Sequence, residues 1–142
     1  LLIIGSGKEK KNLLYLVKKN NLANKIEILD EVKKEDLISY YENASVLIVS
    51  SRDEGGPRVA LEALYLGIPV ISTDVGHMPD ILPKELLANK DDLASLKELL
   101  ELYVDSIDLI DQSAIFEFIQ NEFSIDERVK AITSAYEGVL NN

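Results

Sequence analysis

The 142-residue chain contains 46% hydrophobic and 28% charged residues and carries a formal net charge of −10, values that are ordinary for a globular domain with a sizeable core. It has no cysteine and one histidine, His77, which excludes a disulfide framework and a thiol nucleophile and argues against a histidine-built metal site. Residues 91–142 hold twelve acidic and three basic side chains, and this acidic end argues against nucleic acid as a partner, because phosphate backbones require a basic surface.

Short apolar runs alternate with amphipathic stretches along the chain. Strands are predicted at residues 1–5, 25–29, 45–49, 69–73 and 86–89. Helices are predicted at residues 8–22, 34–44 and 57–67, and near 91–103, 106–122 and 125–140. Pro57 and Gly67 bound the third helix, and Ser124 with Glu127 forms a capping box for the last one. The alternation predicts an α/β fold, a Rossmann-like parallel sheet flanked by helices with extra helices at the C-terminal end, in a single domain over residues 1–142.

Ligands of parallel sheets bind at the carboxyl ends of the strands, which directs attention to the loops after the first, third and fourth strands. The first loop, Gly5-Ser6-Gly7, allows a tight turn and close backbone approach. Position 10 is Lys10 rather than a third glycine, so the loop does not match a dinucleotide-binding pattern. In the loop after the fourth strand, His77 is either a proton donor or polar ligand contact, or a plain loop residue.

The loop after the third strand, SSRDEGGP at residues 50–57, is the most informative. Gly55 and Gly56 let the backbone come close to a ligand, and Pro57 suits the first helical position. The free amides of the residues near 57–60 at the helix start, to which Pro57 contributes no N–H, then favour an anion.

Glu54 and Glu62 flank this expected anion site in the sequence. A carboxylate beside a phosphate site is useful when it accepts hydrogen bonds from hydroxyls, and sugar or ribose hydroxyls are the obvious donors. Spacing alone leaves the alternative equally open, in which Glu54 caps a turn and Glu62 is a solvated helix residue.

Three segments resemble one known family along almost the whole chain: the segment LLIIGSG, the segment KIEILDEVKKEDLISYYENASVLIVSS, and the segment EGGPRVALEALYLGIPVISTDVGHMPDIL. Together they resemble the nucleotide-binding C-terminal domain of retaining glycosyltransferases of the GT-B fold, the group 1 or glycogen-synthase-like family. The resemblance implies an enzyme that transfers a sugar from a nucleotide-diphospho-sugar donor to a sugar or glycan acceptor. It implies neither a metal nor a further cofactor. The lack of cysteine predicts a reducing, cytoplasmic setting, or the inner face of a membrane for the longer protein.

The resemblance also implies roles for particular residues. Glu62 would accept hydrogen bonds from the ribose hydroxyls, and Glu54, the implied catalytic residue, would contact hydroxyls of the donor sugar. Val32 and Lys33 would border the base. The remaining implied donor-binding residues lie in the glycine-rich loops and at the helix start: Gly5, Gly7, Gly55, Gly56, Pro57, Arg58 and Val59.

The sequence departs from the family pattern at several positions. Asp30 stands where the family usually has glycine, Gly56 where many members have an aromatic residue, and Asp80 where glutamate is common. The family's basic Arg and Lys that hold the diphosphate precede the point that corresponds to Leu1, and Arg58 is the residue here that could partly replace them.

The chain begins inside an expected strand, so we interpret it as a piece of a longer protein that lacks the N-terminal acceptor domain and the first strand–helix unit. We therefore expect weak nucleotide binding, no sugar transfer by the piece alone, and dimerisation through the open edge at Leu1 to Ile4. The sequence contains no apolar run near the ~20 residues of a membrane span. The alternatives are a non-catalytic nucleotide-binding or regulatory module on the same fold, or a nucleotide-sugar epimerase.

Overall fold

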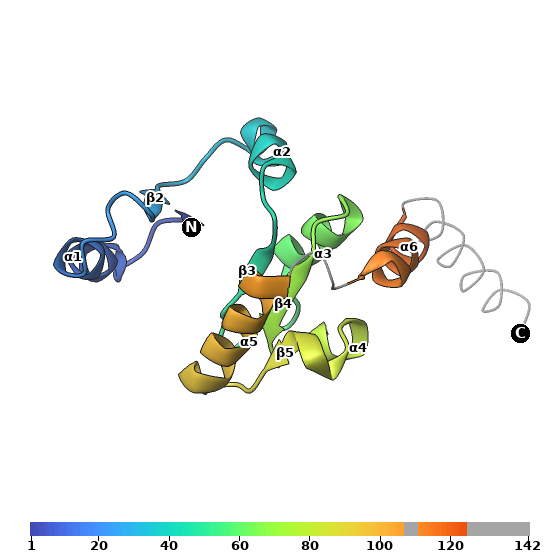
Figure 1. Ribbon diagram of the computed structural model, residues 1–142. Helices are drawn as coiled ribbons and strands as arrows, with labels where there is room; N and C mark the ends of the chain where they lie inside the picture. The colour runs from blue at the N-terminus through green and yellow to red at the C-terminus, as the bar shows by residue number, and fades with distance from the viewer. Residues whose placement is uncertain (107–110, 125–142) are drawn as a thin grey trace, which may run out of the picture. The chain divides into compact units, whose positions relative to one another are not determined.

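The structure, a computed structural model (Figure 1), describes residues 1–106 and 111–124. Its residues fall into two compact units, Leu1–Tyr40 and Tyr41–Asn142. Parallel strands form a two-stranded sheet in the first unit and a three-stranded sheet in the second. The predicted α/β architecture of parallel strands flanked by helices is thus confirmed, with its strands distributed over two sheets. The extent of the domain, residues 1–142, stays a prediction.

The first unit is a strand–helix–strand arrangement. Its elements are β1 (Leu2–Ile4), α1 (Lys10–Lys19) and β2 (Glu27–Leu29), and α2 (Lys34–Glu42) follows them. β1 and β2 are parallel, with Ile3 opposite Ile28. The β1 residues Leu2 and Ile4 are 38% and 36% exposed. The expected association through this edge stays a prediction.

The end of α1 shows why the helix stops at Lys19, three residues before the sequence pattern ends. Asn21 adopts a left-handed backbone conformation with φ 55°, which asparagine tolerates better than most residues. The amide of Asn21 donates to the Lys18 carbonyl at 3.1 Å, and the amide of Leu22 donates to the Val17 carbonyl at 2.9 Å. This pair of bonds is a Schellman motif, which satisfies carbonyls that the helix leaves open.

The second unit is built around β4, the central strand of the sheet β3-β4-β5. All four residues of β4 are buried, as expected for a strand covered on both faces. The strands are β3 (Leu47–Val49), β4 (Val70–Thr73) and β5 (Leu87–Ala88). The helices are α3 (Arg58–Tyr65), α4 (Met78–Ile81), the 3-10 turn η1 (Lys84–Leu86), α5 (Leu93–Ser106) and α6 (Ser113–Glu122).

Helices of the second unit pack on this sheet and on one another (Figure 1). α3 contacts β3 and β4, α5 contacts β4 and β5, and α6 packs against α3. The buried core joins these elements through side chains that include Leu64, Ile71, Tyr103 and Ile119. α3 ends at Tyr65 with Leu66 as its C-cap, and the next residue, Gly67, has a φ of +76°, a conformation that glycine adopts without strain. The core thereby fixes the orientation of the β3 and β4 carboxyl ends.

The structure differs from the predicted elements in the C-terminal half. α4 and η1 lie where loop was expected, because single turns are too short to show helical periodicity. α5 continues to Ser106, and α6 begins at Ser113 rather than at 106, so the predicted boundary between them is wrong. Gln112 explains the late start of α6, since its buried side chain bonds the β4 backbone from a non-helical conformation. The predicted helix 125–140 and its capping box lie outside the described residues.

Candidate functional site

The loop between β3 and α3 is held from the end of the neighbouring strand β4. Thr73 is 5% exposed, and its hydroxyl donates to the Ser51 carbonyl at 2.7 Å. The Ser51 hydroxyl in turn donates to Oε1 of Glu54 at 2.6 Å. Glu54 itself is exposed. The predicted carboxylate therefore has one oxygen bonded within its own loop, while its side chain remains open to solvent.

The loop after β4 lies directly against the same segment. A Cβ atom on Gly76 would come within 2.5 Å of the Gly55 carbonyl oxygen and 2.7 Å of the Glu54 carbonyl oxygen. A Cβ atom on Gly56 would meet Cδ2 of His77 at 3.2 Å. The structure thus brings together the second and third loops singled out from the sequence, and glycine is what permits their close approach.

His77 stands at this junction as an exposed residue. Its Nδ1 lies 3.4 Å from a carboxylate oxygen of Asp80, and both side chains are more than 75% exposed. An exposed pair of this kind contributes little to stability. Its place beside Gly56 brings His77 next to the loop that carries Glu54, and its contact with a ligand stays a prediction.

The start of α3 has the form expected of an anion site. Pro57 is buried and serves as the N-cap with φ −69° and ψ 102°, and no side chain caps the helix there. The amide of Ala60 donates to the Pro57 carbonyl at 3.0 Å. The amides of Arg58 and Val59 precede that first bond, at the end of the helix where the dipole favours negative charge. Both residues have exposed side chains.

Glu62, in the second turn of α3, is paired with a residue that the sequence analysis did not select. The hydroxyl of Tyr41 donates to Oε2 of Glu62 at 2.9 Å and lies 3.5 Å from the Val59 carbonyl oxygen. Burial of the phenol raises the pKa of Tyr41 above its ordinary value, and the hydrogen bond to the Glu62 carboxylate and its negative charge raise it further. No local pattern indicates this contact, because the two residues are 21 positions apart.

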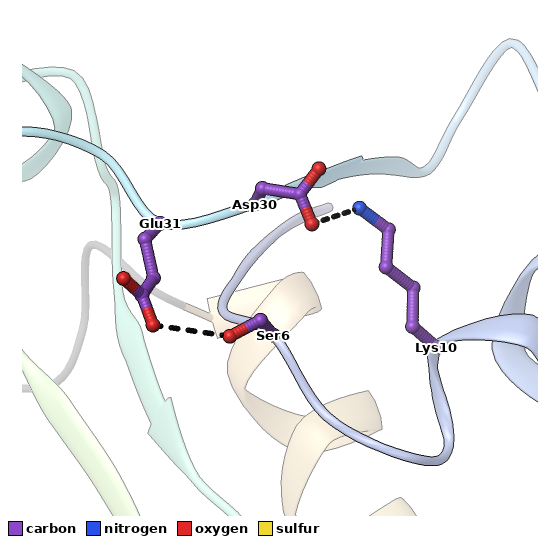
Figure 2. A network of polar contacts seen from close by, with 4 residues as sticks. All are labelled: Ser6, Lys10, Asp30 and Glu31. Carbon is purple, nitrogen blue, oxygen red and sulfur yellow. Dashed lines mark hydrogen bonds and ion pairs between the residues drawn. The ribbon is translucent and has the colours of Figure 1, made fainter.

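Two polar contacts join the glycine loop after β1 to the loop after β2 in the first unit (Figure 2). The Ser6 hydroxyl donates to Oε1 of Glu31 at 3.1 Å, and Nζ of Lys10 lies 2.5 Å from Oδ1 of Asp30. Gly5 has φ +149°, a conformation that side chains rarely adopt. The two residues that depart from glycine in the sequence patterns are therefore partners of each other. Asp30 replaces the glycine usual in the family, and Lys10 occupies the position of the third glycine in a dinucleotide-binding pattern.

The other first-unit residues with an implied role lie in the same two loops. Gly7 accepts a hydrogen bond from the Lys10 amide at 3.2 Å. Val32 is half-buried and Lys33 is exposed, both between β2 and α2. A Cβ atom on Gly7 would meet nothing within 4 Å, so packing inside the unit does not explain glycine at this position.

The loop after β3 is also linked to the loop after β5 by charge. Nε of Arg52 lies 3.4 Å from Oδ1 of Asp91, and Nζ of Lys90 lies 3.9 Å from Oδ1 of Asp53. All four side chains are largely exposed, so each pair contributes on the order of 0–1 kcal/mol. The carboxyl ends of β3, β4 and β5 consequently meet in one group of loops.

Within residues 1–106 and 111–124, acidic, histidine and cysteine side chains form no group of three or more able to hold a metal ion. None of the described helices has the length and apolar character needed to cross a membrane.

Comparison with known proteins places this arrangement in a family. The family described as "Glycosyl transferases group 1" matches residues 1–106. An uncharacterized glycosyltransferase of Methanocaldococcus jannaschii is 39% identical over 104 residues, which make up 70% of this chain and 29% of that protein. An uncharacterized glycosyltransferase of Haemophilus influenzae is 27% identical across 99% of this chain and 39% of that protein. The chain thus spans between 29% and 39% of the length of these curated relatives.

The fold has a counterpart among solved structures. Sucrose-phosphate synthase from Thermosynechococcus elongatus superimposes with a TM-score of 0.82 at 24% sequence identity, covering 99% of this chain and 38% of that one. The fold of this chain is that of the C-terminal domain of GT-B proteins, as the parallel strands and the order of elements indicate.

Proposed function

Because the chain belongs to the group 1 glycosyltransferases, we propose that it is the donor-binding part of an enzyme that moves a sugar from a nucleotide diphosphate to an acceptor hydroxyl with retained anomeric configuration. In this reaction the bond from the anomeric carbon to the diphosphate oxygen breaks and leaves its electron pair on the diphosphate, a bond to the acceptor oxygen forms, and the proton of the acceptor hydroxyl passes to the departing diphosphate. The observation that carries the proposal is the loop between β3 and α3, which the Thr73 hydroxyl holds through the Ser51 carbonyl. Along this segment Glu54, the uncapped start of α3 and Glu62 follow one another.

The helix start is the proposed site of the diphosphate. The amides of Arg58 and Val59 precede the first hydrogen bond of α3, and an anion there is favoured both by these donors and by the helix dipole. Gly55 leaves open space beside the backbone, since a Cβ atom there would meet nothing within 4 Å. The diphosphate can therefore approach the main chain, and the guanidinium of Arg58 adds positive charge for the leaving group.

The two carboxylates have separate proposed roles. Glu62 would accept hydrogen bonds from the ribose hydroxyls, and Glu54 would accept them from hydroxyls of the transferred sugar, beside the reacting carbon. A carboxylate offers about four acceptor positions on its two oxygens. One oxygen of each is already bonded within the protein, Oε1 of Glu54 to Ser51 and Oε2 of Glu62 to Tyr41, which leaves the other oxygen of each for a ligand.

The roles proposed for the first unit rest on family membership. Gly5 and Gly7 would allow the donor to approach the backbone, and Val32 and Lys33 would border the base.

Titration calorimetry of the full-length protein with UDP, with GDP and with a panel of their sugar derivatives tests the proposal. Glu62→Gln should weaken binding of the nucleoside diphosphate by about 1.5–3 kcal/mol, because a charged acceptor is lost. Glu54→Gln should leave diphosphate binding nearly unchanged and weaken the sugar-bearing donor. Glu98→Gln, an exposed glutamate of α5, is the matched control and should behave as wild type.

Gly55→Val tests the diphosphate site directly. The new side chain enters space that is open in the protein, so folding should be spared while the approach of the diphosphate is blocked. Equal affinity of wild type and Gly55→Val would rule out this site. Equal weakening of the plain diphosphate by Glu54→Gln and Glu62→Gln would contradict the separate roles. Nucleotide binding without transfer or hydrolysis would favour a binding module, and an epimerised donor would indicate an epimerase.

A further inference from the structure

Tyr41 approaches Glu62 from a different helix. Tyr41 lies in the last turn of α2 and packs against the core of the second unit as a partly buried residue. Its hydroxyl is 2.9 Å from Oε2 of Glu62 and 3.5 Å from the Val59 carbonyl oxygen. A phenol donates one hydrogen, and the shorter distance assigns that hydrogen to the carboxylate.

This contact limits how the Glu62 side chain can lie. The terminal torsion of a glutamate is broad and roughly two-fold, so an exposed carboxylate on a helix samples many orientations. A hydrogen bond from a partly buried phenol selects those in which Oε2 faces the Tyr41 hydroxyl. Oε1 is then the oxygen presented to a ligand, at a position set by the packing of Tyr41.

We propose that Tyr41 is a positioning residue that holds the Glu62 carboxylate in the orientation that accepts the ribose hydroxyls of the donor. The inference rests on the proposed function, since it assumes that Glu62 meets the ribose. In this proposal Tyr41 acts through Glu62 and not on the donor directly. Its contribution is to reduce the freedom that Glu62 would otherwise lose on binding.

Ribose hydroxyls can be removed from the ligand, which makes the inference testable by calorimetry on the full-length protein. UDP and GDP are each compared with their 2′,3′-dideoxy analogues on wild type, Tyr41→Phe and Tyr65→Phe. Tyr41→Phe removes the hydroxyl and keeps the ring, so the packing of the ring on the core is retained. Tyr65→Phe is the matched control, because Tyr65 is 51% exposed at the end of α3.

Tyr41→Phe should weaken the ribonucleotide about threefold to tenfold, as expected for one hydrogen bond, and should leave the dideoxy analogue unchanged. In a Glu62→Ala background, Tyr41→Phe should cause no further loss of affinity, since the acceptor that the phenol positions is absent. Spectrophotometric titration of the phenol gives a readout apart from binding: Glu62→Gln should move the pKa of Tyr41 back toward its ordinary value, while the part due to burial persists.

Three results would overturn the inference. Tyr41→Phe could bind the ribonucleotide as tightly as wild type does, it could lose affinity by the same factor for the ribonucleotide and the dideoxy analogue, or its full loss of affinity could persist in the Glu62→Ala background. Each of these, with tight nucleotide binding by wild type, leaves the proposed function standing. Failure of wild type to bind either diphosphate removes the proposed function, and the inference with it.

Discussion

Gly76→Ala should separate the two loops that form the candidate site. The backbone there has φ +53°, which costs a residue other than glycine about 1–2 kcal/mol. The new Cβ would also lie 2.5 Å from the Gly55 carbonyl oxygen, where ordinary contact begins at 3.4 Å. The backbone must therefore shift by about 0.9 Å, and overpacking of this kind typically costs about 1–3 kcal/mol. The expected loss of stability is about 2–5 kcal/mol.

Gly67→Ala is the matched control, because alanine there has the same unfavourable positive φ but its Cβ atom does not clash with a neighbouring atom. Its φ is +76°, and a Cβ atom there would meet nothing within 4 Å. Native-state hydrogen exchange of the β3 and β4 amides in the full-length protein measures the free energy of opening of both variants. Gly76→Ala should lose about 1–3 kcal/mol more than Gly67→Ala, and it should also weaken donor binding. Equal losses in the two variants would refute the close packing of these loops.

Two further predictions concern stability. The buried side-chain amide of Gln112 forms hydrogen bonds with the backbone N–H and C=O of Val70 in β4 and with the Tyr103 hydroxyl. Gln112→Leu should therefore lower the free energy of unfolding by about 1–3 kcal/mol for each buried group left without a partner. Gln120→Leu, at an exposed position, should lower it by under about 1 kcal/mol in the same hydrogen-exchange experiment. The raised pKa of Tyr41 means that the folded state favours the neutral phenol, so stability from this group is present below pH ~10 and is lost as pH rises beyond it. The urea midpoint of wild type should fall more steeply from pH 9 to 11 than that of Tyr41→Phe, and parallel profiles would show that the phenol is not paired with Glu62.

Much of the local structure follows from the sequence pattern. Pro57 and Gly67 bound α3 because both act on the backbone of their own and adjacent residues. The apolar run of β4 indicates a strand buried on both faces, and it is buried. Glycines in two loops after neighbouring parallel strands predict that these loops come together at one edge. Family membership follows from the same segments, because the order and spacing of their residues are properties of the sequence.

The contacts that shape the site depend on residues far apart in the chain. Tyr41 reaches Glu62 across 21 positions, and Gln112 reaches Val70 across 42. The Tyr41 position on its helix predicts an inward-facing side chain but gives no partner for its hydroxyl. The sequence pattern likewise predicted one helix near residues 106–122, whereas residues 111 and 112 are not helical and α6 begins at Ser113. The late start exists because the Gln112 side chain completes the hydrogen bonding of β4.

The difference between the features that the sequence predicts and the contacts that only the structure shows has a physical cause. Helix periodicity, caps and turns depend on residues within about four positions of one another, because backbone hydrogen bonds and neighbouring side chains act over that range. Side-chain hydrogen bonds such as those of Tyr41 and Gln112, and the collision that excludes a side chain at Gly76, arise only when the sheet and its helices are packed. The sequence by itself therefore determined the order of elements, the family and the loops of the candidate site, whereas the tertiary structure decided that the Tyr41 hydroxyl holds the Glu62 carboxylate and why glycine is required at position 76.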